Sequence, residues 1–142
     1  MRMVLDTNVL VSALITPGGM PDQLLQQWEA GQYALVTSEE QLIELQRVLG
    51  YEKLSRFIHP DQTARLVANL RQAAEVVTTL PHVTASSDEA DNLIIASAIA
   101  GNASHLTTGD RAHLLSLKRV GSIQIVTARE AVDLIAAQSD AN

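Results

Sequence analysis

Short β-rich apolar runs alternate with segments of helical periodicity along the chain, and this alternation restricts the possible folds more than any other feature. The runs expected to form strands are residues 3–5, 33–37, 105–108 and 123–126. Strands that are separated by helices need crossover connections and therefore pair in parallel. The sequence thus predicts an α/β fold, a three-layer α/β/α sandwich with a mostly parallel central sheet.

The helices between these strands have recognisable start and stop residues. We expect helices over 9–15, 21–31, 38–50, 51–58, from residue 60 onward, 88–100, shortly after 110, and from 127 onward. Three of them begin with the sequence pattern of a capping box: Ser38 with Gln41, Ser86 with Glu89 and Thr127 with Glu130. The helix over 88–100 is apolar on almost all sides after its first turn, which indicates that it is buried.

The length of 142 residues predicts a single domain over residues 1–142. The chain has no cysteine, so we expect a reducing, cytoplasmic environment, and any metal must bind oxygen or imidazole ligands. The longest apolar runs are far shorter than the roughly 20 residues that span a bilayer, so no membrane segment is expected. Asp6 interrupts the apolar stretch that a signal peptide would need, so no targeting segment is expected.

Acidic side chains fall where ligands bind in open parallel sheets, beyond the carboxyl ends of the strands. Asp6 follows the first strand, and Asp110 follows a later one. Asp91 lies in the first turn of the buried helix. Glu44 lies at the edge of the apolar stripe of its helix, whereas Glu40 lies one turn earlier and further toward solvent.

Each of these acids also has a purely structural explanation. Asp6 could cap the following helix, and Asp91 and Asp110 lie where a helix dipole favours negative charge. Glu44 could be a solvated charge on a helix face. Convergence favours function, because several unpaired carboxylates in one crevice repel each other unless a cation neutralises them. Mg²⁺ or Mn²⁺ would suit these oxygen ligands and would support hydrolytic phosphoryl transfer.

Four short motifs follow one another over nearly the whole chain: Asp6-Thr7-Asn8-Val9-Leu10, Ser38 with Glu44 and Leu45, Asp88-Glu89-Ala90-Asp91-Asn92, and Thr107-Thr108-Gly109-Asp110. In this order and spacing they resemble the PIN-domain ribonucleases, and among these the VapC-type toxins of toxin–antitoxin systems. The resemblance implies an Mg²⁺- or Mn²⁺-dependent endoribonuclease acting on RNA. Its acids would be Asp6, Glu44, Asp91 and Asp110, supported by Asn8 and Thr108. It also implies a small antitoxin partner and a homodimer or higher homo-oligomer.

The net charge of −6 is unfavourable for binding a polyanion, so basic groups near the crevice are needed to hold RNA. The candidates follow two of the acids in the sequence: Arg47, Lys53 and Arg56 after Glu44, and Arg111, Lys118 and Arg119 after Asp110. The four aromatic residues are too few for extensive base stacking. The four histidines show no metal-binding spacing and are expected to be structural or exposed.

Three other classes of protein were weighed against a nuclease. An Mg²⁺-dependent phosphatase of the haloacid-dehalogenase type needs a second aspartate two residues after the first, where this sequence has Asn8. A response-regulator receiver domain needs an acidic pair after the first strand and a central phosphoacceptor aspartate, but the second strand ends at Ser38. A PIN-like module that only docks a partner stays open as the alternative.

Overall fold

A computed structural model describes residues 1–110 and 113–141 of the chain. Six strands form one sheet in the order β3-β2-β1-β4-β6-β5. Neighbouring strands pair in parallel except β5, which pairs antiparallel with β6. The strands are β1 Arg2–Leu5, β2 Ala34–Ser38, β3 Glu75–Val77, β4 His105–Thr107, β5 Arg119–Val120 and β6 Ile123–Val126. The α/β class and the mostly parallel sheet are therefore confirmed.

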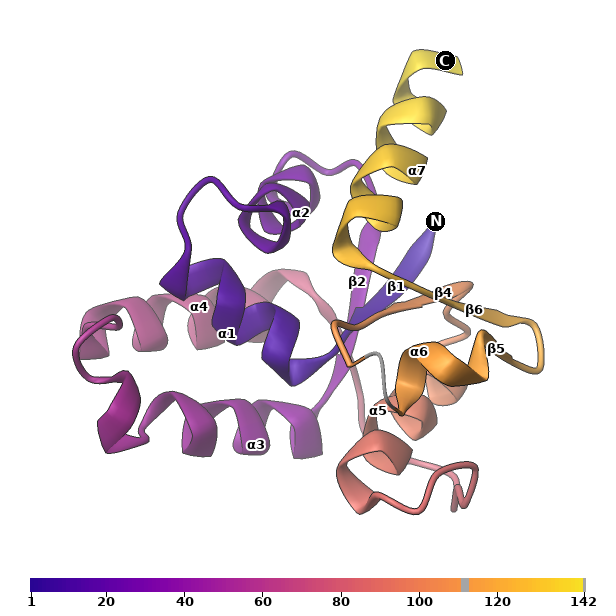
Figure 1. Ribbon diagram of the computed structural model, residues 1–142, viewed down its shortest axis with the longest axis horizontal. Helices are drawn as coiled ribbons and strands as arrows, with labels where there is room; N and C mark the ends of the chain where they lie inside the picture. Colours follow the sequence, from indigo (N-terminus) through magenta and orange to yellow (C-terminus); the bar gives the residue numbers. More distant parts are fainter. Residues whose placement is uncertain (111–112, 142) are drawn as a thin grey trace.

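Helices cover both faces of this sheet (Figure 1). One face carries α1 Thr7–Ile15, α2 Met20–Glu29, α3 Glu39–Leu49, α4 Pro60–Ala73 and α7 Ala128–Ala141, and the other carries α5 Glu89–Ala100 and α6 Leu114–Leu117. Side chains alternate along β1, so that Met3 and Leu5 join the larger apolar core while Val4 joins the core under α5. Both faces of the central strands are thereby buried, as in a three-layer α/β/α sandwich.

Three local predictions need correction. A single 3₁₀ turn, η1 Glu52–Leu54, occupies the segment expected to be a helix over 51–58. Asp88, and not Ser86, caps α5, because the Asp88 side chain accepts a hydrogen bond from the Ala90 N–H at 2.8 Å. The strands β3 and β5 are not among the four expected strands, because they have only three and two residues and each depends on pairing with a neighbouring strand.

The C-terminal end of α5 packs directly against the sheet. Gly101, the C-cap of α5, lies so close to β2 that a Cβ atom added there would be 2.2 Å from the Val36 Cγ1 atom. The Arg2 side chain donates to the Gly101 carbonyl from the opposite end of the chain. This contact fixes the height of α5 over the sheet and therefore the position of its first turn.

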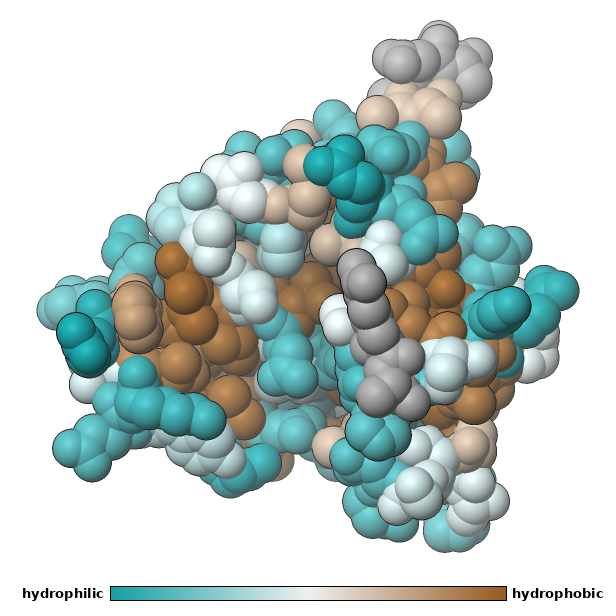
Figure 2. Space-filling model, viewed as in Figure 1, coloured by the Kyte–Doolittle hydropathy of each residue, from teal (hydrophilic) through white to brown (hydrophobic). Residues whose placement is uncertain are grey.

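Apolar residues are not confined to the interior. Ile43 on α3 and Phe57 in the segment after it are exposed, and Figure 2 shows apolar surface at the end of the molecule where α1 and α3 lie. Among the described residues, no helix combines the length and the apolar character needed to cross a bilayer.

Candidate active site

The carboxyl ends of the central strands meet at one edge of the sheet, where the acidic side chains gather. Asp6 follows β1, and its N–H donates to the Thr107 carbonyl of β4 at 2.8 Å. Thr108, which follows β4, donates its N–H to the Val126 carbonyl of β6 at 3.0 Å. The backbone therefore fixes the residues after β1 and β4 side by side.

The Asp6 carboxylate is a buried acceptor rather than a helix cap. Asp6 occupies the N-cap position of α1, but its side chain makes no capping hydrogen bond. Instead its Oδ2 atom accepts a hydrogen bond from the Thr108 hydroxyl at 2.8 Å, and the residue is only 8% exposed. Burial raises the pKa of Asp6, the Thr108 hydrogen bond opposes this, and the charges of Asp91 and Glu44 raise the pKa further.

Asp91 in the first turn of α5 is the second buried acid. It is 7% exposed, and its Oδ2 atom accepts a hydrogen bond from the Ser86 hydroxyl at 3.1 Å. Asn92 holds the same segment, because its side chain bonds both the N–H and the carbonyl of Ser86. Burial raises the pKa of Asp91, and the negative charges of Asp88 and Asp110 add to this shift.

Asp110 pairs with a histidine that sequence analysis did not single out. The Nδ1 atom of His113 lies 3.1 Å from Asp110 Oδ2, and the His113 N–H donates to Asp110 Oδ1 at 3.2 Å. Asp91, Asp110 and His113 each offer a ligand atom, and these atoms lie within 4.8 Å of one another. The two carboxylates suit a divalent cation such as Mn²⁺ or Mg²⁺, whereas an imidazole is more typical of sites for Zn²⁺ or Fe²⁺. A cation would offset the part of the Asp91 pKa shift that comes from the charges of Asp88 and Asp110.

Glu44 is the fourth candidate acid and lies on α3, where its charge acts on Asp6. It is half-buried while Glu40 is exposed, which confirms the predicted difference between the two. Its Oε2 atom accepts a hydrogen bond from the Thr7 hydroxyl at 3.4 Å, and Arg47 lies 3.9 Å from its Oε1 atom. Asp6 and Glu44 are not among the three residues grouped by ligand distance, and Glu44 connects to the cluster through its charge on Asp6.

The two expected supporting residues differ in what they contact. The Thr108 hydroxyl bonds Asp6 and also accepts a hydrogen bond from the Asp110 N–H at 3.1 Å. Asn8 is exposed and lines a groove together with Asp110, without a hydrogen bond to the acids among the described residues.

Sequence analysis missed the direct partners Thr7, Ser86 and His113. Thr7 stands inside the Asp6 motif, and Ser86 was interpreted as a helix cap. His113 follows Asp110 by three residues, the spacing of neighbours on one face of a helical turn, and this spacing is the signal that could have identified it.

Two of the six basic residues expected near the crevice contact Tyr51, and one of these two, Arg47, also pairs with Glu44. The guanidinium of Arg47 and the Nζ atom of Lys53 lie 5.6 and 5.7 Å from the centroid of the Tyr51 ring. Arg56 and Lys118 are exposed. Arg119 is also exposed, but it lies on β5 opposite Gln124, toward the amino ends of the parallel strands, whereas the acids follow the carboxyl ends. Arg119 is therefore not one of the basic groups at the crevice. Arg111 lies outside the described residues.

A parallel sheet with acids converging at its carboxyl edge defines a class of α/β proteins suited to binding a divalent cation. Within this class, a family model described as PIN domain matches residues 2–112, so the chain belongs to the PIN-domain family. The fold is also similar to a chain in the crystal structure of VapBC2 from Rickettsia felis bound to a DNA fragment from their promoter. That similarity has a TM-score of 0.58 at 19% identity and covers 89% of this chain and 98% of that chain. No curated protein matches this sequence.

Proposed function

We propose that this protein is a divalent-metal-dependent endoribonuclease that hydrolyses phosphodiester bonds of RNA. The observation that carries the proposal is the convergence of Asp6, Asp91 and Asp110 at one edge of a PIN-domain sheet, with the raised pKa of the two buried aspartates as its electrostatic signature. Burial is the main cause of both raised pKa values, and the charges of neighbouring carboxylates add to it. A bound cation would offset these negative charges.

Each acid has a distinct role in this proposal. Asp91 and Asp110 would hold Mg²⁺ or Mn²⁺, with His113 beside them. Asp6 and Glu44 would complete the negative surroundings of the ion, and Thr108 would orient both Asp6 and Asp110. The bound cation would activate water and stabilise the leaving oxygen. Asn8, exposed on the rim of the groove, is free to contact the substrate.

The proposal predicts RNA products that carry a 5′-phosphate. The serine and the histidine beside the acids, Ser86 and His113, are hydrogen-bonded to Asp91 and Asp110, so in this proposal they hold the carboxylates and water attacks phosphorus directly. The test is to incubate single-stranded RNA with the protein in Mn²⁺ or Mg²⁺ and to map the new ends. Products ending in a 2′,3′-cyclic phosphate, or cleavage that persists in EDTA, would contradict the proposal.

We also propose that the protein is the toxin component of a toxin–antitoxin pair, with a small protein antitoxin, and that it forms a homodimer or a larger homo-oligomer. The likeness to VapBC2 supports the first statement, and the exposed Ile43 and Phe57 give apolar surface for protein contacts. Co-purification of a small protein encoded beside this chain, followed by light scattering of the complex and of the free protein, tests both statements.

The second candidate function is a docking module without catalysis. It is favoured by the engagement of Arg47 and Lys53 with Tyr51, which leaves fewer cations for RNA near Glu44. A protein that binds its partner at full affinity when Asp91 is replaced by Asn, and that does not cleave RNA in any metal, would fit this function. A phosphatase would instead release phosphate from small esters under the same conditions.

A further inference from the structure

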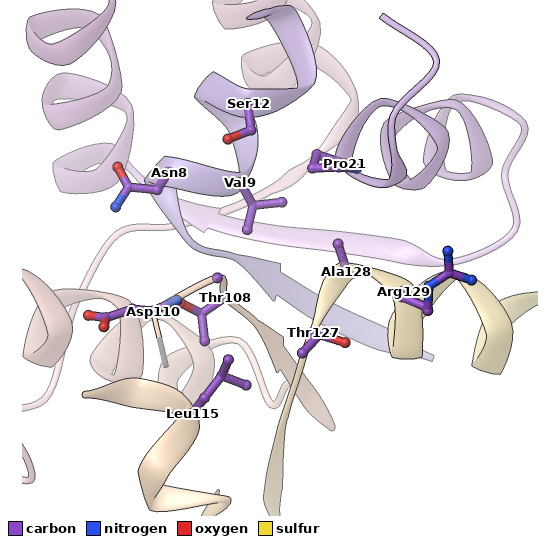
Figure 3. Close-up of a pocket in the computed structure, with 11 residues that line it drawn as sticks. Asn8, Val9, Ser12, Pro21, Thr108, Asp110, Leu115, Thr127, Ala128 and Arg129 are labelled. Carbon is purple, nitrogen blue, oxygen red and sulfur yellow. The ribbon is translucent and has the colours of Figure 1, made fainter. Parts of the chain in front are cut away.

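A groove of about 600 Å³ leads away from the acid cluster toward the start of α7. Its floor is formed by Thr108 and Thr127, which follow the neighbouring parallel strands β4 and β6. Asn8 and Asp110 stand at one end, and Arg129 stands at the other (Figure 3). A molecule that lies in this groove therefore contacts Asp110 and Arg129 at the same time or bridges between them.

Charge in the groove is distributed unequally between its two ends. Among the described residues that line it, Asp110 and Arg129 are the charged ones. A divalent cation held at Asp110 would make that end attractive to an anion, and Arg129 makes the other end attractive too. The groove is thus suited to a ligand with at least two negative charges along its length.

The Arg129 side chain is not used for holding the fold together. Arg2 pairs with Glu75 and Arg71 pairs with Glu39, but Arg129 is exposed and makes no ion pair or side-chain hydrogen bond with the described residues. Arg129 also lies in the first turn of α7, where the helix dipole disfavours a positive charge. Its position is unfavourable for the helix and favourable for an anionic ligand.

The other lining residues indicate which part of a polyanion the groove contacts. Val9, Pro21, Leu115 and Ala128 are small or aliphatic, and none of the lining residues that the structure describes is aromatic. Bases held by stacking would require aromatic faces. The groove instead offers a guanidinium for phosphate and aliphatic surface for ribose, so contact is made with the backbone and not with particular bases.

We propose that this groove holds the RNA strand next to the scissile phosphate, and that Arg129 binds a neighbouring backbone phosphate. The inference rests on the proposed nuclease function and adds to it a substrate-binding residue and a path for the strand along the groove. A nucleic-acid strand is favoured over an acidic peptide, because the groove runs continuously into the proposed cation site, where a phosphate is the group to be cleaved.

The test compares Arg129→Gln with Arg129→Lys and with Arg119→Gln, an exposed arginine on the edge strand β5 that does not line the groove. Binding of a short fluorescein-labelled single-stranded RNA is measured by anisotropy in Ca²⁺ over a range of salt concentrations, and cleavage is measured in Mn²⁺. Arg129→Gln should raise Kd and KM by about tenfold. It should also reduce the salt slope of log Kd by about 0.7, the value for one phosphate on a single strand, with little change in kcat. Arg129→Lys should keep the slope, and Arg119→Gln should resemble the wild type.

The outcomes separate this inference from the proposed function. Cleavage with an unchanged salt slope in Arg129→Gln overturns the inference and leaves the nuclease intact. RNA binding that depends on Arg129 without cleavage in any metal retains the inference and overturns the nuclease. Equal losses in Arg129→Gln and Arg119→Gln would show a nonspecific charge effect, and loss of a protein partner with unchanged RNA binding would assign the groove to an acidic peptide. Both results overturn the inference.

Discussion

The Thr108 hydroxyl connects two acids that come from different elements. It donates to the Asp6 carboxylate after β1 and accepts from the Asp110 N–H after β4, while the residue itself is completely buried. A hydroxyl can do both because it has one proton and two lone pairs. The separation between Asp6 and Asp110 therefore depends on a single side chain that carries no charge.

Replacing Thr108 with Val should reduce metal-dependent cleavage by about 10- to 100-fold, the usual effect of losing a residue that orients metal ligands. The unfolding free energy should also fall by about 1–3 kcal/mol, because Asp6 loses its donor in a buried site. Thr107→Val is the matched control, since Thr107 is equally buried but its hydroxyl contacts only the Met3 sulfur. RNA cleavage kinetics and urea unfolding of both variants test this prediction. Equal losses in Thr108→Val and Thr107→Val would contradict a specific role of the Thr108 hydroxyl in orienting the acids.

Glu44→Gln should lower kcat/KM by about 100-fold, because the substitution keeps the side-chain volume and removes a charge beside Asp6. Asp91→Asn should have an effect at least as large. Glu40→Gln, one turn earlier on the same helix and exposed, should stay within a factor of about two of the wild type. The RNA cleavage assay checks all three. Loss of cleavage in Glu40→Gln together with retention in Glu44→Gln would reverse the assignment.

At the scale of elements, Gly101→Ala should destabilise the protein by about 1–3 kcal/mol through overpacking. The added methyl meets Val36, which is fully buried on β2 and cannot move aside. Gly50→Ala is the control, because Gly50 is also a helix C-cap with a similar backbone conformation, while its added Cβ would have only ordinary contacts at 3.5 Å. Thermal unfolding of the two variants compares them directly, and equal stability would contradict the close approach of α5 to β2.

The elements show where sequence reasoning succeeds and where it fails. Thr127 and Glu130 form the expected reciprocal cap of α7, because both partners are local and exposed. Ser38 caps α3 as expected, but the Gln41 side chain leaves the capping box and donates to the Leu5 carbonyl at 2.6 Å. Burial at the end of β1 offers Gln41 an unpaired carbonyl, and no local pattern could show this.

In the candidate site, too, local signals could be predicted and contacts between distant segments could not. The ends of the strands and the positions of residues around each helix were enough to place the acids at one edge of the sheet, because both follow from the periodicity of the sequence. The partner Ser86 could not be assigned in this way, because its role depends on the path of the loop before α5. His113 differs, because its spacing of three residues from Asp110 is a local signal. The 3₁₀ turn and β5 escaped prediction for a related reason, since both are short and depend on tertiary contacts.

For the whole molecule, the clustered acids make stability depend on cations. Wild-type protein should melt higher as Mn²⁺ or Mg²⁺ is added, gaining about 1.4 kcal/mol at ten times Kd, or about 4 °C. The Asp6→Asn, Asp91→Asn double variant should lose most of this gain. The control is the Glu40→Gln, Asp133→Asn double variant, which removes the same amount of charge from exposed positions and should keep the metal-dependent gain in stability. Melting curves at constant ionic strength test this, and equal shifts in both double variants would place the metal elsewhere.

Without metal, the stability of the protein should fall as pH rises from about 4 toward neutrality. The pKa values of Asp6 and Asp91 are raised in the folded state, so over this range the folded state binds more protons than the unfolded state. Their favourable contribution is complete at low pH and disappears as the pH passes through the raised pKa values. Urea unfolding in EDTA at several pH values measures this slope, which should be smaller in the Asp6→Asn, Asp91→Asn variant.

The pairing of β1 with β4 has a consequence for how the protein is made. Met3 lies opposite His105 in the register, and the hydrogen bond between Asp6 and Thr108 spans 102 positions of sequence. Such distant contacts form slowly, and they cannot form on a ribosome before residues 105–108 have emerged. Asp6, Glu44 and Asp91 are therefore synthesised well before they can act together. The acid cluster is therefore completed late, when β6 supplies the Val126 carbonyl that holds Thr108 in place.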